Sequence, residues 1–193
     1  MSLDLSECSD GELRALALAG SEASYREFLT RYKAPVYRLI RGTIGDADEA
    51  LDVTQEAFVS AFAALKAYDP ARPFQNWISR IALNKCRDWA RRRAVRSFFT
   101  HAVPIEDGLG VVAAQPLPDA EAFDRAALAR VMQAMARLPH RLREVLVLRT
   151  IEGLSQAEAA DVLGISEKAV ETRLYRARIQ LSSLAGDHKD YEG

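Results

Sequence analysis

The chain has 193 residues, of which 49% are hydrophobic and 27% charged, and its 26 basic and 27 acidic residues leave a formal net charge of −1. This apolar fraction is sufficient for one core or two small ones and excludes a wholly disordered chain. No apolar run reaches the roughly 18 residues of a membrane span. The acidic start MSLDLSECSDGELR lacks the positive and apolar segments of a secretion signal. We therefore expect a cytoplasmic protein.

The residues that usually carry catalysis or bind metals are sparse. The two cysteines, Cys8 and Cys86, have no CxxC spacing, and no histidine pairs with a cysteine or carboxylate at ligand spacing; the histidines are His101, His140 and His188. GxSxG, HExxH and Gly-rich phosphate-loop motifs are also absent from the sequence. We expect no enzyme, no metal, no cofactor and no small-molecule substrate, and a buried thiol at Cys86.

The first 45 residues contain helix-capping residues and apolar residues at helical spacing. Ser9 and Glu12 fit a capping box, and Ser21 can cap a long helix that Pro35 should kink and Gly45 should end. The long helix carries one apolar stripe: Tyr25, Phe28, Leu29, Tyr32, Val36, Leu39 and Ile40.

The next helix begins at Asp46 and Glu49 and is acidic, with five carboxylates and no basic residue in 46–58. Large apolar residues predict its buried face: Leu51, Phe58, Phe62 and Leu65. Opposite them, i, i+3, i+4 and i+7 spacing places four residues on one outer face: Asp52, Gln55, Glu56 and Val59. Such a face is either simply solvated or a surface for a basic partner protein.

A loop, AYDPARPF, precedes a basic helix that should begin near Pro73 and end near Arg93. Its apolar residues should pack inward: Phe74, Trp77, Ile78 and Ile81. Another four residues form a polar stripe: Arg80, Asn84, Arg87 and Arg91. Basic residues beside the aromatic residues of the loop suit unstacked, single-stranded bases, although an ordinary solvated surface helix remains an alternative.

Periodicity disappears between Ala94 and Asp119, where prolines and glycines accumulate, and returns at Ala120. We predict an all-α protein of two small helical domains joined by a flexible acidic linker. The predicted ranges are 1–95 for the first domain, 96–119 for the linker, 120–187 for the second domain and 188–193 for a tail.

The second domain ends in a predicted helix-turn-helix. Ser155 with Glu158 caps its first helix, Gly164 permits the turn, and Ser166 caps its second helix. The second helix buries one stripe, namely Val170, Leu174, Ala177 and Leu181, and turns another outward, namely Lys168, Glu171, Thr172, Tyr175, Arg176 and Arg178. The N-terminal part of such a helix enters the major groove of DNA, while its arginines, Arg173 included, should mostly hold phosphates. A helical hairpin with a solvated charged face is the alternative.

Two long segments together resemble a known family. DEALDVTQEAFVSAFAALKAYDPARPFQNWISRIALNKCRDWARRR resembles region two of bacterial sigma factors of the extracytoplasmic-function type. ARLPHRLREVLVLRTIEGLSQAEAADVLGISEKAVETRLYRARIQL resembles region four of the same factors. The resemblance covers most of the chain, and it implies a protein that binds core RNA polymerase and directs it to promoters. It also implies a stress or environmental response and an anti-sigma factor as a partner, which in this family is often membrane-anchored.

The resemblance implies three residue sets. The core polymerase would contact Asp52, Gln55, Glu56 and Val59. The −10 element would be recognised and melted by Tyr68, Asp69, Phe74, Arg80, Asn84, Arg87 and Arg91. The −35 element would be read by Lys168, Glu171, Thr172, Arg173, Tyr175 and Arg176.

One residue departs from the family pattern, which often has a basic residue where this chain has Glu171. A carboxylate can accept a hydrogen bond from the amino group of cytosine, so the family's promoter preference does not carry over. Three rival interpretations stay open at this point. They are a sigma mimic that binds only a regulator, a stand-alone transcriptional regulator, and a small helical enzyme.

Overall fold

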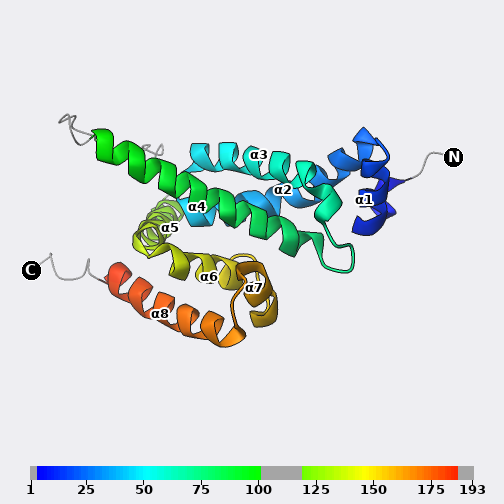
Figure 1. Ribbon diagram of the computed structural model, residues 1–193. Coiled ribbons are helices and arrows are strands. Elements are labelled where there is room, and N and C mark those ends of the chain that lie inside the picture. The colour runs from blue at the N-terminus through cyan, green and yellow to red at the C-terminus, as the bar shows by residue number, and fades with distance from the viewer. Residues whose placement is uncertain (1–3, 101–118, 187–193) are drawn as a thin grey trace, which may run out of the picture.

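The structure is a computed structural model that describes residues 4–100 and 119–186 (Figure 1). Within these ranges the chain forms helices and no strand, in agreement with the all-α prediction. Two short 3-10 turns, η1 (Leu5–Glu7) and η2 (Leu65–Ala67), accompany the helices. The helices are α1 (Asp10–Leu18), α2 (Glu22–Ile44), α3 (Ala47–Ala63), α4 (Phe74–Thr100), α5 (Asp119–Arg137), α6 (His140–Thr150), α7 (Gln156–Leu163) and α8 (Glu167–Gly186).

Helices α1 to α4 form the first bundle, and its helix ends follow the sequence signals. The Ser9 hydroxyl accepts from the Glu12 amide while the Glu12 carboxylate accepts from the Ser9 amide, so the predicted capping box is present. Helix α2 ends at Gly45 with φ of 89°, a left-handed conformation that glycine adopts without steric cost. Helix α2 also continues through Pro35 as one element.

Helix α3 is rotated relative to the predicted buried face. Small residues, Ala50, Ala57 and Ala61, fill the interface with its neighbours and are fully buried. Leu51 is 46% exposed, so its prediction as a core residue is wrong, whereas Phe58 and Leu65 are buried as predicted. The large residues misled the prediction because alanines allow close helix packing without adding to an apolar stripe.

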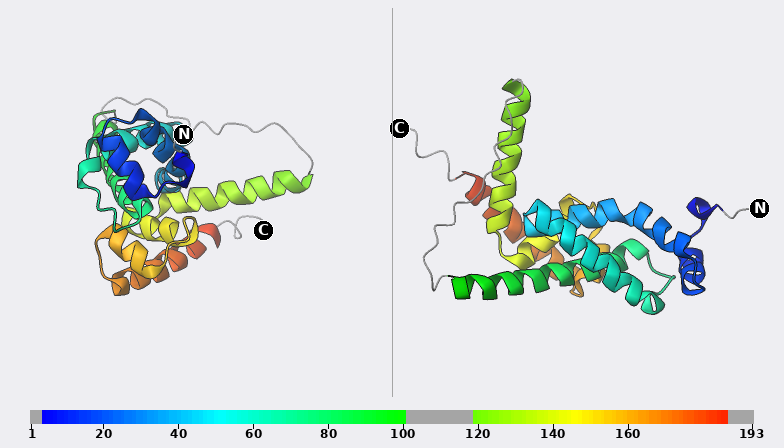
Figure 2. Two further views of the ribbon diagram at one scale, coloured as in Figure 1. Left: turned by 90° about the vertical axis from the view of Figure 1, so that its right-hand side faces the viewer. Right: turned by 90° about the horizontal axis from the view of Figure 1, so that it is seen from above.

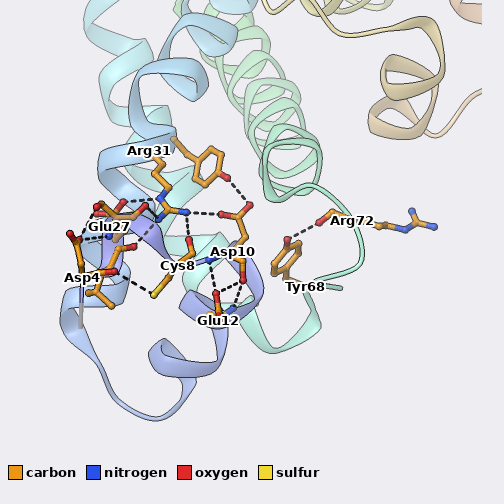
Figure 3. Close-up of polar contacts among 12 residues, drawn as sticks. Asp4, Cys8, Asp10, Glu12, Glu27, Arg31, Tyr68 and Arg72 are labelled. Carbon is orange, nitrogen blue, oxygen red and sulfur yellow. Dashed lines mark hydrogen bonds and ion pairs between the residues drawn. The ribbon is translucent and has the colours of Figure 1, made fainter. Parts of the chain in front are cut away.

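An arginine at the centre of α2 ties the N-terminal turn to the bundle (Figure 3). Arg31 donates to the carbonyl oxygens of Cys8 at 2.7 Å, Leu5 at 2.8 Å and Ser6 at 2.9 Å, and it also pairs with Glu27 at 2.7 Å. These bonds join three carbonyls of the N-terminal turn to α2, so this turn has a fixed position against that helix.

Helices α5 to α8 form the second bundle, in which α7, a tight turn and α8 make the predicted helix-turn-helix. Ser155 and Glu158 form the predicted capping box of α7, and Gly164 ends that helix with φ of 64°. The Ser166 hydroxyl accepts from the Ala169 amide at 3.2 Å and caps α8. Helix α5 extends beyond the other helices as an arm (Figure 2).

The two bundles pack against each other, with α6 and α7 beside α2 and α4 (Figure 1). Helix α4 continues to Thr100, beyond the predicted end near Arg93 and into the range predicted as linker. Residues 101–118 and 187–193, which hold most of the predicted linker and the tail, lie outside the described residues. Among the described residues, no helix has the length and apolarity of a membrane span.

Candidate functional site

The outer face of α3 presents three of its four predicted residues to solvent. Asp52 and Gln55 are exposed, and Val59 is 69% exposed, which is unusual for a valine of a folded domain. Glu56 instead accepts from Arg92 of α4 at 3.2 Å and 3.3 Å, so part of its charge is neutralised within the bundle. The face can therefore meet a partner through two polar side chains and an exposed apolar one.

A groove of about 430 Å³ lies beside this face, between α2 and α3. Leu29, Leu51 and Phe58 supply its apolar surface, with Gln55 and Lys33 at its polar edge. The exposed Leu51 is therefore part of an apolar groove and not a single apolar side chain on a polar surface. An amphipathic helix or strand of a partner would fit such a surface.

The loop between α3 and α4 places two predicted DNA-binding residues in the core. Phe74 is fully buried and stacks on Phe28 at 4.3 Å between ring centroids, and Tyr68 is 2% exposed with its ring 5.2 Å from Phe74. The Tyr68 hydroxyl donates to the carbonyl oxygen of Arg72 at 2.7 Å, and burial raises its pKa to about 12. Neither ring is available to stack on a base in this structure. Aromatic residues in a loop are equally suited to holding that loop on a core.

The same loop carries polar groups that do reach the surface. Asp69 is exposed and accepts from the Ala71 amide at 3.0 Å, which fixes the turn. The guanidinium of Arg72 points away from Tyr68 (Figure 3). Together with Trp77 and Arg80 they line a pocket of about 300 Å³, whose wall includes Asp161 of α7.

The polar stripe of α4 forms as predicted, and two of its four residues contact the second bundle. Arg80 donates to the Asp161 carboxylate at 3.3 Å, and Arg72 reaches the same oxygen at 3.0 Å. One turn beyond Arg80, Asn84 is exposed and accepts from Arg87 at 2.9 Å. Arg91 pairs locally with Asp88 of the same helix.

Arg87 makes the most buried of these contacts. Its Nε and Nη2 donate to the two oxygens of Glu144 of α6 at 2.7 Å and 2.8 Å. The Glu144 side chain is only 2% exposed while that of Arg87 is 40% exposed. The hydrogen bonds to Glu144 raise the pKa of Arg87 above its ordinary value, so the guanidinium stays charged. A bidentate pair of this kind is strong because both partners are ionised and geometrically matched.

The outer face of α8 is open, in agreement with the prediction. All six residues predicted to turn outward are exposed, namely Lys168, Glu171, Thr172, Tyr175, Arg176 and Arg178, whereas Arg173 is partly buried. Glu171 pairs with Lys168 at 3.0 Å on this face. Val170 and Ala177 are fully buried beneath it, so the helix has one packed side and one free side.

The ion pairs between the two bundles involve three residues that the sequence pattern did not indicate, namely Arg72, Glu144 and Asp161. Glu144 and Asp161 lie 57 and 81 residues from their partners Arg87 and Arg80, so no local spacing could have indicated the pairing. One chemical signal was available for Glu144. It is the acidic residue of the mostly basic stretch 137–149, which indicates that its carboxylate pairs with an arginine. No group of three or more His, Cys, Asp or Glu suited to a metal ion occurs among the described residues.

Known proteins share both halves of this arrangement. Residues 28–96 match the family described as Sigma-70 region 2, and residues 128–181 match Sigma-70, region 4. The chain is 40% identical over 181 residues to RNA polymerase sigma factor CnrH of Cupriavidus metallidurans, which covers 92% of this chain and 95% of the relative. The chain belongs to the RNA polymerase sigma factors. It is also 30% identical over 172 residues to ECF RNA polymerase sigma factor SigW of Bacillus subtilis, which covers 87% of this chain and 92% of the relative.

The solved structure of CnrH in complex with the cytosolic domain of CnrY is similar to this one, with a TM-score of 0.68, 35% identity, 94% coverage of this chain and 99% of that chain. The resemblance to sigma factors of the extracytoplasmic-function type is thus confirmed. Proteins of this family are transcription initiation factors that bind core RNA polymerase and promoter DNA.

Proposed function

We propose that the sigma factor divides its work among three surfaces, one for polymerase and two for DNA. The observation that supports this best is the separation of charge: an exposed acidic face on α3, a basic stripe on α4 and an open polar face on α8. The factor would act in the cytoplasm and without catalysis of its own. Its ranges would be 1–95 for the polymerase and −10 domain, 96–119 for the linker, 120–187 for the −35 domain and 188–193 for the tail.

Core polymerase would bind the α3 face through Asp52, Gln55 and Val59. Two polar residues and an exposed valine on one face suit a basic partner helix. Glu56 would contribute less than predicted from the sequence because its carboxylate already holds Arg92 at 3.2 Å.

The −10 element would be bound by the α4 stripe and the neighbouring loop. Arg80, Arg87 and Arg91 would hold the backbone, and the amide of Asn84 would meet a base after it leaves the stack. The pocket beside Asp69 and Trp77 could receive that base once Asp161 withdraws. Tyr68 and Phe74 would act from the core, by holding the loop in place.

The −35 element would be read by the exposed face of α8. Lys168, Glu171 and Thr172 lie in the first turns of that helix, the part that enters a major groove in helix-turn-helix proteins. Arg173, Tyr175 and Arg176 lie further along and would contact the backbone, where arginine binds phosphate oxygens in a fixed fork.

An anti-sigma factor would restrain the protein, in keeping with the solved complex of CnrH with the cytosolic domain of CnrY. The groove formed by Leu29, Leu51 and Phe58 is a suitable docking surface for such a partner, because it is apolar and borders the proposed polymerase face. A membrane anchor on that partner and a stress or environmental signal that releases it would complete the regulation.

Promoter-dependent run-off transcription with purified core polymerase tests the proposal. We expect specific initiation with the wild-type factor and at least a tenfold loss with Asp52→Arg plus Gln55→Arg, since reversing the charge at Asp52 and adding a positive charge at Gln55 replace attraction to a basic partner by repulsion. The matched control is Glu7→Arg plus Glu22→Gln, which makes the same charge change of +3 at two exposed carboxylates outside α3 and should retain wild-type activity. Absence of initiation by the wild-type factor on a library of promoters would contradict the proposed function.

A further inference from the structure

Helix α1 is attached to the start of the loop between α3 and α4, residues 68–73. The guanidinium of Arg14 donates from Nη2 to the carbonyl oxygen of Lys66 at 2.8 Å and from Nε to that of Leu65 at 3.3 Å. Both carbonyls belong to η2, the turn from which the loop departs. A positive charge is favourable at such a helical end, because its last carbonyls carry partial negative charge. Arg14 therefore fixes the point at which the loop begins.

A glycine allows α1 to lie close to the middle of the same loop. A Cβ added at Gly11 would lie 3.2 Å from the Cβ of Pro70, which is tighter than an ordinary contact between carbon atoms. Gly11 and Arg14 are three residues apart and so share one face of α1. Leu13 and Ala17 are buried in the core and hold the helix in place. One face of a well-anchored helix thus contacts the loop at two points.

A third contact joins α1 to the aromatic residues beneath the loop. The Tyr32 hydroxyl donates to the Asp10 carboxylate of α1 at 2.6 Å (Figure 3). Burial raises the pKa of Tyr32 above its ordinary value, and the hydrogen bond to Asp10 adds to this shift, so the hydroxyl keeps its proton. The Tyr32 ring lies 4.9 Å from that of Phe74, which in turn lies 5.2 Å from Tyr68. Helix α1 therefore supports both the backbone of the loop and the rings on which it rests.

We propose that α1 is the support of the −10 loop and that Arg14 is a positioning residue for base capture during promoter opening. This inference rests on the proposed function, because it takes the pocket beside Asp69 and Trp77 to receive an unstacked base. Ala67, the residue that follows the two carbonyls held by Arg14, lines this pocket of about 300 Å³. Arg14 would act through the backbone of η2 and would touch no DNA itself.

Two kinds of attachment have different effects on the loop. Bonds within the loop define its shape: the Tyr68 hydroxyl donates to the Arg72 carbonyl, and the Ala71 amide donates to Asp69. Arg14 instead comes from a separate helix and limits how far the whole loop can move. A loop that is already in place binds a base more tightly, because less conformational freedom is lost on binding. Arg14 is only partly buried, so its loss should weaken base capture by about threefold to tenfold.

The first experiment measures amide hydrogen exchange of the full-length chain by mass spectrometry. We expect Arg14→Ala to accelerate exchange by about threefold to tenfold in peptides covering 65–73 and to leave peptides of α4 unchanged. Arg14→Lys keeps a charged donor and should lie between Arg14→Ala and wild type. The matched control, Arg26→Ala, removes an exposed arginine of α2 and should behave as wild type. Unchanged exchange in 65–73 with Arg14→Ala, or equal acceleration throughout the bundle, would overturn the proposal.

The second experiment uses holoenzyme and a promoter library randomised across the −10 element. We expect Arg14→Ala to reduce base preference about threefold to tenfold at one or two neighbouring −10 positions, with the −35 profile unchanged. Gly11→Leu adds a side chain against Pro70 and removes no hydrogen bond or charge, so it should weaken preference at the same positions. Arg26→Ala should leave both profiles as in wild type.

The outcomes of the library experiment separate this inference from the function on which it rests. A wild-type factor without any −10 preference would contradict both. A wild-type preference that persists unchanged in Arg14→Ala and Gly11→Leu would overturn the role of α1 alone. An even loss of transcription across the library would show that Arg14 only stabilises the fold, and it would overturn the positioning role as well.

Discussion

Helices α4 and α8 carry similar sets of side chains but differ in what surrounds them. Both place arginines on one face, yet Arg87 of α4 meets a carboxylate that is 2% exposed, while Arg176 of α8 faces solvent. A sequence pattern shows which residues share a helix face. Whether that face is available depends on packing between segments far apart in the chain.

The contrast also bears on the near-zero net charge of the chain. Acidic residues of the second bundle neutralise arginines of the first, and acidic residues of α3 lie on an exposed face of their own. A sigma factor shares the task of holding DNA with polymerase, so it has no need of a large positive field. Segregated charge serves discrimination and partner choice better than a uniformly basic surface.

The largest expected difference between the two helices is in stability. Arg87→Ala should lower the free energy of unfolding by about 2–3 kcal/mol, because it leaves the buried Glu144 carboxylate without its partner; partial exposure of Arg87 keeps the loss below that of a fully buried pair. Arg176→Ala should change the free energy of unfolding by less than about 0.5 kcal/mol. Urea unfolding followed by circular dichroism checks both, and equal losses would remove the distinction between the helices.

The fold could be predicted to a large extent because capping side chains and glycines mark where its helices begin and end. Ser9, Ser155 and Gly164 act on backbone groups within a few residues, so their effects are visible in the sequence. The end of α4 was harder to predict. We expected it near Arg93, but no glycine or proline follows at that point and the helix continues to Thr100.

The candidate site could be predicted only as far as side chains share a helix face. The outward residues of α8 were predicted because helical period alone determines them. The −10 roles of Tyr68 and Phe74 stay predictions: the structure buries both rings, and for Phe74 the apolar pattern predicted this, whereas for Tyr68 it did not. The pairing of Arg87 with Glu144 and of Arg80 with Asp161 was not predicted. The second omission has a physical cause, since ion pairs across the two bundles depend on contacts that no local spacing encodes.

The open face of α8 should read bases through Glu171. An ionised carboxylate only accepts hydrogen bonds and so favours the cytosine amino group. Glu171→Ala should relax preference at one or two −35 positions by about 1–2 kcal/mol, in the lower part of the usual range because Lys168 shares the carboxylate at 3.0 Å. A randomised −35 library transcribed by holoenzyme gives the base profile. Arg176→Ala is the control and should reduce transcription evenly across the library; an altered base profile with Arg176→Ala would reverse the two roles.

Helix α4 should act later in initiation, through Asn84, which is exposed next to the paired Arg87. Asn84→Ala removes a neutral hydrogen bond to an unstacked base, so we expect a loss of about 0.5–1.5 kcal/mol in promoter opening. Closed-complex formation should change less, because duplex DNA offers no such base. Permanganate reactivity of promoter thymines compared with footprinting of the closed complex separates the steps, and equal losses in both would make Asn84 a docking contact.

The smallest expected effect comes from His140, which lies in the cleft between α4 and the second bundle beside Arg87, Arg141 and Glu144. Burial, followed by the nearby positive charge of Arg143, lowers the pKa of His140 below its ordinary value of 6.5. The unfolded chain therefore takes up the proton first as pH falls, so stability present above pH 6.5 should decrease as pH falls through 6.5 toward the lower folded pKa. Because His140 is only partly buried, the loss between pH 7.5 and 5.5 should stay below about 1 kcal/mol.

A second group titrates in the same experiment. Burial raises the pKa of Glu152, so its contribution increases the free energy of unfolding as pH falls. The informative quantity is therefore the difference between wild type and His140→Asn. Urea midpoints that fall by the same amount in both proteins would show that the cleft histidine does not contribute.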